Sequence, residues 1–292
     1  MKLGLVLAGG GARGAYQIGV WKALAKLKID KYIKVVSGTS IGALNTILFL
    51  QGDIKLAEEI WCNVTSKQIL PLDEKDLILK GILFYLGSKN MTFIKKYLPM
   101  LVKGGTLSRE GLENILKKID FNKIKNSNIN GYATCTSIPE IRAKYFKFNE
   151  NSTEDIKNIL YATSAVPLIY DSALINNVSY LDGGIVDNVP IQPVYGEGCD
   201  VIIVVKLSVD SYIDIEKYPN TKIIEINSLE SEGADLRGMM DFNKDIIKQR
   251  IAKGYMDTMY KFQPIMQLAR KIDSDEIKSK ENLINNIKRI FK

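Results

Sequence analysis

The N-terminal part of the chain alternates short apolar runs with helical spacings of apolar positions. Residues 2–8 form a short apolar run that ends in glycines, which is typical of a buried strand. From residue 12 to residue 27 the apolar positions follow helical spacing. Residues 33–37 form a second apolar run, and residues 43–50 have the composition of a largely buried helix. This order predicts parallel strands that are joined by right-handed crossovers.

The rest of the chain continues this pattern, apart from residues 64–105. The further strands that we expect span residues 129–136, 141–148, 178–181, 200–207 and 222–226, and the further helices span residues 108–119, 154–163, 241–262 and 275–291. Ser108 is the candidate N-cap of the first of these helices. Because no repeat, linker or low-complexity tract divides the sequence, we expect one α/β domain over residues 1–292, closed by the helices of residues 241–292.

Residues 64–105 interrupt this alternation of strands and helices. Apolar blocks alternate with lysines there in an amphipathic, helix-like pattern. A helical insertion that packs over the core fits this pattern, and so does a lid or a membrane-contact surface. The sequence leaves both interpretations open.

The absence of histidine narrows the chemistry that this chain can perform. None of its 292 residues is a histidine, which excludes a Ser-His-Asp triad, a Cys-His pair and any imidazole base. Cys62, Cys135 and Cys199 are widely spaced, so we expect free thiols, no zinc or iron site and no cofactor. A hydrolase of this composition must use carboxylates, hydroxyls, lysines, backbone dipoles or a carboxylate-bound metal.

The charge of the chain favours contact with anionic surfaces. The formal net charge is +7 and the isoelectric point is about 9.0, which suits a membrane or a nucleic acid. The lysines are spread along the whole chain, as on solvated helix faces, and we expect no nucleic-acid partner. The first apolar run is too short for a signal peptide, and no apolar stretch reaches the span of a bilayer. We therefore predict a cytoplasmic protein, with peripheral membrane contact as a further expectation.

A glycine-rich loop follows the first expected strand. Its sequence, Gly9-Gly10-Gly11-Ala12-Arg13-Gly14, lies where a strand gives way to a helix, so backbone amides there can bind a phosphate or an oxyanion. The spacing also fits a dinucleotide-binding fingerprint, but that requires an acidic residue at the end of the second strand. The second strand ends in Ser37-Gly38-Thr39-Ser40 instead, which disfavours a dinucleotide-binding site. Arg13 can steady the loop or contact a lipid phosphate, and we favour support of the loop.

A second glycine turn presents a serine. Gly38-Thr39-Ser40-Ile41-Gly42 has the form G-x-S-x-G, in which a strained strand-to-helix turn projects the serine as a nucleophile. An ordinary turn with an N-cap serine is the alternative. A serine nucleophile needs a base and oxyanion donors, and the first glycine loop can supply the donors, because neighbouring parallel strands end on the same side of a sheet.

Without histidine, the expected base is a carboxylate. Asp182-Gly183-Gly184 places an aspartate at the end of an expected strand, with two glycines that leave room for a close neighbour. Asp187 is the competing candidate. In isolation, Asp-Gly-Gly is more often a plain turn.

Together, the three motifs at residues 9–14, 38–42 and 182–184 resemble those of the patatin-like phospholipase family, specifically its bacterial cytoplasmic members. Residues 162–167 and 188–190 extend the resemblance. It implies a three-layer α/β/α sandwich around a mainly parallel sheet. It also implies Ser40 as the nucleophile and Asp182 as the base. Gly9, Gly10, Gly11 and Arg13 would form the oxyanion hole.

The resemblance further implies a serine lipid acyl hydrolase, a phospholipase or esterase that needs neither calcium nor another cofactor. Its substrate would be a phospholipid or neutral lipid ester. Two other functions stay open: a lipid acyltransferase, in which another alcohol replaces water, and a catalytically idle lipid-binding regulatory protein.

Overall fold

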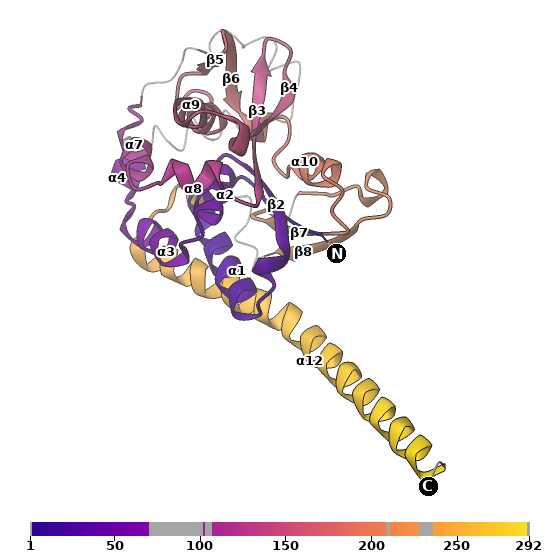
Figure 1. The fold of residues 1–292 in the computed structure, drawn as a ribbon. Coiled ribbons are helices and arrows are strands. Elements are labelled where there is room, and N and C mark those ends of the chain that lie inside the picture. Colours follow the sequence, from indigo (N-terminus) through magenta and orange to yellow (C-terminus); the bar gives the residue numbers. More distant parts are fainter. Residues whose placement is uncertain (1, 70–101, 103–106, 209–210, 228–235, 291–292) are drawn as a thin grey trace.

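The computed structural model describes residues 2–69, 102, 107–208, 211–227 and 236–290, and in these residues an eight-stranded sheet forms the centre (Figure 1). The strands are β1 (Leu3–Leu7), β2 (Ile33–Thr39), β3 (Asn130–Ile138), β4 (Arg142–Lys147), β5 (Ala173–Ile175), β6 (Val178–Asp182), β7 (Val201–Lys206) and β8 (Lys222–Asn227). Their order is β5, β6, β3, β2, β1, β7, β8, and β4 also pairs with β3. The pairs β1–β2, β2–β3, β1–β7 and β7–β8 are parallel. The expected mainly parallel sheet is therefore confirmed.

Helices follow most of the strands. They are α1 (Ala15–Lys26), α2 (Ile41–Gln51), α3 (Ile54–Asn63), α4 (Ser66–Ile69), α7 (Glu110–Leu116), α8 (Phe121–Lys125), α9 (Thr153–Thr163), α10 (Ile191–Gly196), α11 (Leu236–Met240) and α12 (Lys244–Ile290). Short 3-10 turns include η1 (Gly11–Gly14), directly before α1, and η4 (Gly183–Ile185), directly after β6. Among the described residues, no helix is both long and apolar enough to cross a membrane.

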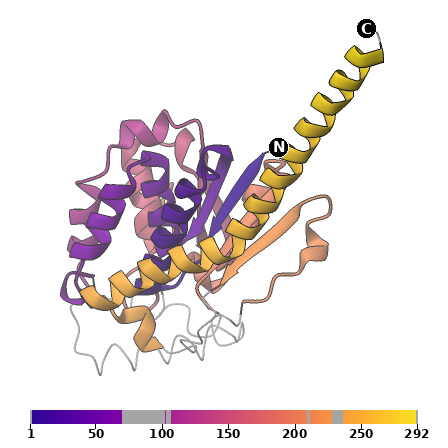
Figure 2. The ribbon, with the colours of Figure 1, turned by 90° about the horizontal axis from the view of Figure 1, so that it is seen from below.

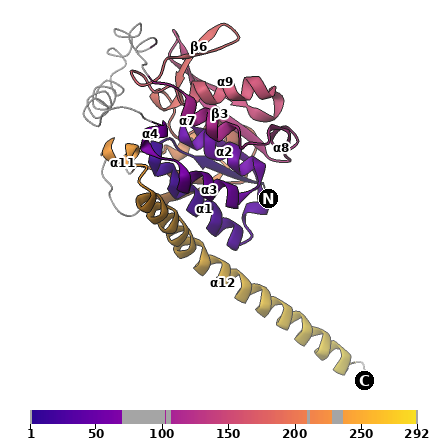
Figure 3. The same ribbon diagram turned by 90° about the vertical axis from the view of Figure 1, so that its left-hand side faces the viewer.

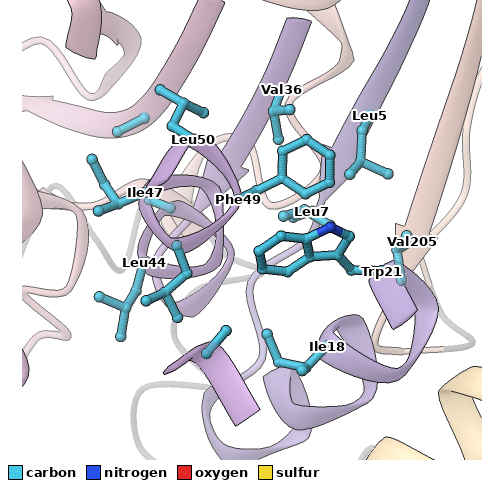
Figure 4. Packing of buried hydrophobic residues seen from close by; sticks show 14 of the residues in the cluster. Leu5, Leu7, Ile18, Trp21, Val36, Leu44, Ile47, Phe49, Leu50 and Val205 are labelled. Atoms are coloured by element: carbon cyan, nitrogen blue, oxygen red, sulfur yellow. The ribbon is translucent and has the colours of Figure 1, made fainter. Parts of the chain in front are cut away.

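The parallel strands bury side chains on both faces of the sheet. Along β1, Leu5 and Leu7 belong to the main core, whereas Val6 belongs to a second cluster. The main core packs β1, β2 and β7 against α1 and α2 (Figure 4). The second cluster packs the opposite face against Ile191 and Val194 of α10. In the described part of the chain the third layer is thus thin on that side, with one six-residue helix.

Both tryptophans lie in the main core, at 6% exposure for Trp21 and 3% for Trp61. Trp21 packs against Phe49 of α2, with ring centroids 4.9 Å apart. The three cysteines are free, as expected; Cys135 and Cys199 are buried and Cys62 is half-buried.

The C-terminal helices differ from the expectation. The two helices expected at residues 241–262 and 275–291 form the single helix α12, with Pro264 inside it. A proline inside a helix removes one hydrogen bond and its ring crowds the preceding turn, which can kink a helix without ending it. The first half of α12 runs along α1, and the second half extends away from the body (Figures 1, 2 and 3).

The contact between α1 and α12 depends on two glycines. A Cβ on Gly19 would lie 1.9 Å from the Ile251 carbonyl oxygen, and a Cβ on Gly254 would lie 2.0 Å from the Tyr16 carbonyl oxygen. The two backbones therefore touch directly, which anchors α12 to the core.

The predicted N-cap Ser108 was wrong by one position: α7 begins at Glu110 with Arg109 as its N-cap, and the Ser108 hydroxyl accepts the Glu110 amide at 3.1 Å. Most of residues 64–105, for which a lid and plain packing stayed open, lies outside the described residues.

Candidate active site

The ends of β2 and β6 meet along one edge of β3. Thr39, the last residue of β2, pairs with Thr134, and Asp182, the last residue of β6, pairs with the next residue of β3, Cys135. β4 pairs with this same stretch of β3, so β4 occupies the opposite edge. Because β2 and β6 run toward each other, Ser40 follows Thr39 into the place where β6 ends. The sheet thereby brings together two predicted site residues that are far apart in the sequence.

Ser40 occupies a strained turn between β2 and α2. Its φ is 54° and its ψ is −121°, a backbone conformation that a residue with a side chain rarely adopts. It stands at the N-cap position of α2, but its side chain makes no capping hydrogen bond. The turn is tight, because a Cβ on Gly38 would lie 2.2 Å from the Gly42 carbonyl oxygen. This geometry fits a nucleophile turn better than an ordinary serine cap.

Asp182 is a buried carboxyl group beside Ser40. Its exposed fraction is 4%, and Oδ1 accepts the Gly184 amide at 2.7 Å. Among the described residues, Oδ2 has no hydrogen-bond partner. Burial raises the pKa of Asp182 from 3.8 to about 6, although the Ser40 hydroxyl and the Gly184 amide both lower it. A buried oxygen without a partner is the kind of group that a reaction can use.

Asp187, the competing candidate, has partners on both oxygens. The Tyr145 hydroxyl donates to Oδ2 at 2.8 Å, and the Val189 amide donates to Oδ1 at 3.2 Å. The Asp187 backbone carbonyl accepts the Thr39 hydroxyl at 2.9 Å. These contacts are those of a residue that braces the turn.

The amides of the glycine loop differ in their partners. The Gly9 amide donates to the Asn188 carbonyl at 3.1 Å, and the Arg13 amide donates to the Gly10 carbonyl at 3.2 Å. For the amides of Gly10 and Gly11, no backbone acceptor occurs in the described part of the chain. Of the predicted loop residues, Gly10 and Gly11 are therefore the ones whose amides have no backbone acceptor among the described residues.

The Arg13 side chain lies in the interior. It is 6% exposed, and its guanidinium donates to the Leu207 carbonyl at 3.4 Å. This contact favours the interpretation that Arg13 supports the loop over the one in which it meets a lipid phosphate.

Residues 5–195 match the family model described as Patatin-like phospholipase. The chain belongs to the patatin-like phospholipase family. Lysophospholipase nte1 of Aspergillus terreus is 28% identical over 203 residues, which are 70% of this chain and 12% of that protein. The probable lipid hydrolase 463L of Invertebrate iridescent virus 6 is 29% identical over 191 residues, 64% of this chain and 61% of that protein. This chain thus corresponds to a small part of the fungal protein.

A solved structure supports the patatin-like fold. The crystal structure of VipD from Legionella pneumophila superposes with a TM-score of 0.52 at 16% sequence identity, covering 89% of this chain and 66% of VipD. At this identity the likeness concerns the fold alone.

The patatin-like match ends at residue 195, but later elements support the glycine loop. Gly11 has a φ of 56°, and a Cβ there would lie 2.2 Å from the Met239 carbonyl oxygen, so α11 lies directly on the loop. The buried Arg250 of α12 donates to the carbonyls of Gly238, at 2.8 Å, and Asp241, at 2.9 Å. α12 therefore holds α11 against the loop.

Sequence reasoning missed a buried polar network that joins the loop to α2. Asn45 Nδ2 donates to the Gly14 carbonyl at 2.9 Å and to Gln17 Oε1 at 2.7 Å. Gln17 Nε2 donates to the Ala8 carbonyl at 2.8 Å, and Trp61 donates to Asn45 Oδ1 at 2.9 Å. The available signal was an asparagine within the otherwise largely apolar run at residues 43–50. The network ties both ends of the glycine loop to the helix that begins after Ser40.

Proposed function

We propose that this protein is a serine hydrolase of lipid esters that uses Ser40 and Asp182 as a catalytic dyad. The observation that carries the proposal is the meeting of β2 and β6. It sets a serine in a strained turn beside a buried carboxyl group with one unpartnered oxygen. No histidine is needed for this arrangement, and the sequence contains none.

Asp182 acts as the general base. Oδ1 is held by the Gly184 amide, which leaves Oδ2 to accept the proton of the Ser40 hydroxyl. A pKa near 6 makes Asp182 a stronger base than an ordinary carboxylate, and it is still largely ionised at neutral pH. The Ser40 oxygen attacks the ester carbonyl as its proton passes to Asp182.

The amides of Gly10 and Gly11 stabilise the oxyanion that forms on the carbonyl oxygen. Amides without an internal acceptor lose no hydrogen bond when the oxyanion arrives, and preorganised donors of this kind contribute strongly to catalysis. Gly9 and Arg13 keep the loop in shape through their own internal contacts.

The ester then breaks in two stages. Collapse of the first tetrahedral intermediate expels the alcohol, which takes the proton from Asp182, and leaves the acyl group on Ser40. Water then attacks the acyl enzyme while Asp182 accepts a proton from it, and Ser40 recovers its hydrogen as the fatty acid leaves.

Lipid esters are the proposed substrates. The family and the names of the two relatives, a lysophospholipase and a probable lipid hydrolase, support this class. The formal charge of +7 supports contact with an anionic lipid surface. The mechanism requires no calcium or other metal, because a buried carboxylate and backbone amides perform its steps.

The test combines a covalent probe with product analysis. The wild-type protein is expected to react with a fluorophosphonate probe and to release fatty acid from a panel of phospholipids, lysophospholipids and neutral glycerides. Ser40→Ala is expected to lose both activities while its thermal unfolding stays close to wild type.

Each alternative function has its own result. A wild-type protein that binds vesicles but neither reacts with the probe nor releases fatty acid would be an idle lipid-binding protein. Acylated lysolipid or glycerol, formed in place of fatty acid when these acceptors are added, would identify an acyltransferase. An alanine variant that still cleaves esters at the wild-type rate would refute the role of Ser40.

A further inference from the structure

Thr163, the last residue of α9, touches the nucleophile turn. Its hydroxyl oxygen accepts the Ser40 backbone amide at 2.9 Å, and the same hydroxyl donates to the Thr134 carbonyl of β3 at 2.6 Å. The Thr163 side chain is buried, at 1% exposure. One hydroxyl group therefore links α9, the strand β3 and the turn that carries Ser40.

Two residues later, the same segment holds Asp182. The Asp182 backbone amide donates to the Ala165 carbonyl at 3.0 Å, and Ala165 is fully buried. From the other side, the Thr136 hydroxyl of β3 donates to the Asp182 carbonyl at 2.8 Å. The backbone of Asp182 is thus fixed at both its amide and its carbonyl.

Ser40 needs this support because its backbone is strained. It follows the last residue of β2 and precedes the first residue of α2, so its amide has no partner within either element. A non-glycine residue at positive φ persists only where the surroundings hold it. The Thr163 oxygen is the acceptor that holds it.

We propose that Thr163 and Ala165 set the separation between Ser40 and Asp182, with Thr163 as a positioning residue whose hydroxyl holds the nucleophile turn. The inference rests on the proposed Ser40–Asp182 dyad. Thr163 itself does not touch the substrate; it acts through Ser40. Without the hydroxyl, the Ser40 amide loses its acceptor and the Thr134 carbonyl loses its donor. The strained turn then relaxes, and the hydroxyl of Ser40 moves relative to Oδ2 of Asp182.

The role requires a hydroxyl group rather than a side chain of a given volume. Valine has the shape of threonine but neither donates nor accepts a hydrogen bond, whereas serine does both. Thr163→Val is therefore the disrupting variant and Thr163→Ser is the rescuing one. Ser164→Ala is a matched control, because the neighbouring Ser164 hydroxyl donates to the Leu160 carbonyl at 2.7 Å within α9 and not to the dyad.

The experiment measures ester hydrolysis and fluorophosphonate labelling of the full chain for wild type, Ser40→Ala and the three variants. For Thr163→Val we expect kcat to fall about 10- to 100-fold with little change in KM, since small misplacements of reacting groups have effects of this size. Thr163→Ser recovers most of the rate, and Ser164→Ala stays near wild type. If Thr163→Val does not fold, Thr163→Ala takes its place against Thr163→Ser.

The pH profile separates positioning from a general loss of folded protein. The Ser40 hydroxyl lowers the pKa of Asp182, so a displaced Ser40 should move the acid limb of kcat/KM to higher pH in Thr163→Val. Cys135 also faces Asp182, but burial raises the pKa of its thiol well above the ordinary value, so it stays neutral across this range. A variant that is merely less stable keeps the wild-type limb.

Two results overturn the inference. One is a Thr163→Val protein with wild-type kcat; the other is equal impairment of the valine and serine variants with an unmoved acid limb. Failure of the proposed function looks different, because Ser40→Ala would then keep the wild-type rate whatever Thr163 does.

Discussion

The Tyr145 hydroxyl donates a hydrogen bond of 2.8 Å to Oδ2 of Asp187. With the Val189 amide on Oδ1, this contact occupies both carboxyl oxygens of Asp187, whereas Asp182 keeps one buried oxygen without a partner in the described part of the chain. Two aspartates five residues apart thus have opposite surroundings. Asp187 holds the turn, whereas the unpartnered oxygen of Asp182 supports its proposed role as the base.

This contrast predicts opposite effects for the two amide variants. Asp182→Asn should lose most of kcat, because an amide accepts no proton at working pH. Asp187→Asn should keep activity within severalfold of wild type, since an asparagine oxygen can still accept the Val189 amide. Steady-state kinetics on both variants decide the assignment. An inactive Asp187→Asn variant together with an active Asp182→Asn variant would identify Asp187 as the base.

The raised pKa of Asp182 predicts the pH dependence of both activity and stability. kcat/KM should decrease as the pH drops below about 6, because Asp182 is then protonated. Any residual activity of Asp182→Asn should not show this decrease. Between pH 3.8 and about 6 the folded protein binds more protons at Asp182 than the unfolded chain does, so this group makes stability decrease as pH rises through that window. Above it, the ionised carboxyl group should lower the free energy of unfolding relative to its value at acid pH, on the order of a few kcal/mol.

Asp182→Asn should therefore unfold at a higher temperature than wild type at pH 8, and the difference should shrink toward pH 4. Thermal unfolding at the two pH values measures this. An equal shift at both pH values would mean that the carboxyl group is not buried in its charged form.

Changes in the glycine loop should lower the rate more than they raise KM. In Gly10→Ala the new Cβ would lie 2.9 Å from both Cβ and Cδ1 of Leu207, so the loop or the segment that carries Leu207 has to shift and the amide is displaced. Loss of one oxyanion donor typically lowers kcat on the order of 100-fold. Gly196→Ala, where no atom lies within 4 Å of the new Cβ, is the matched control. If Gly10→Ala raised KM alone, the loop would contribute to substrate binding and not to stabilisation of the oxyanion.

The contact between α1 and α12 should be intolerant of added volume. Gly254→Ala places a Cβ 2.0 Å from the Tyr16 carbonyl oxygen, a backbone atom that cannot move independently. Overpacking of this kind typically lowers the free energy of unfolding by about 1–3 kcal/mol. Chemical denaturation of Gly254→Ala against Gly196→Ala measures the effect. Wild-type stability in Gly254→Ala would show that α12 does not pack closely on α1.

Activity should persist in excess EDTA. The described residues contain no group of three or more His, Cys, Asp or Glu side chains that could hold a metal ion, and the proposed steps use none. Hydrolysis is to be measured with EDTA and again after calcium is restored. Loss with chelator and recovery with calcium would contradict the metal-independent mechanism.

The sequence determined the local parts of the site. Strand, glycine turn and helix follow one another at residues 3–26 and again at residues 33–51, because apolar periodicity and glycine placement are local properties. The absence of histidine directed the search for a base toward carboxylates, and the three motifs together indicated the patatin-like family. Short elements such as β5 and α11 carry too few residues to show a periodicity, and the sequence did not predict them.

Only the tertiary structure decided which of these parts meet. β2 and β6 both pair with β3, along the same edge, and this brings Ser40 to Asp182 although they lie more than a hundred residues apart in the sequence. No local pattern encodes the register of these two pairings. Burial, which gives Asp182 its raised pKa, depends on neighbours from other strands. Tyr145, which donates to Asp187, and Ser40, whose amide donates to Thr163, likewise belong to distant segments. Hydrogen bonding and desolvation act through space, so these contacts and the raised pKa of Asp182 could not be predicted from the sequence alone.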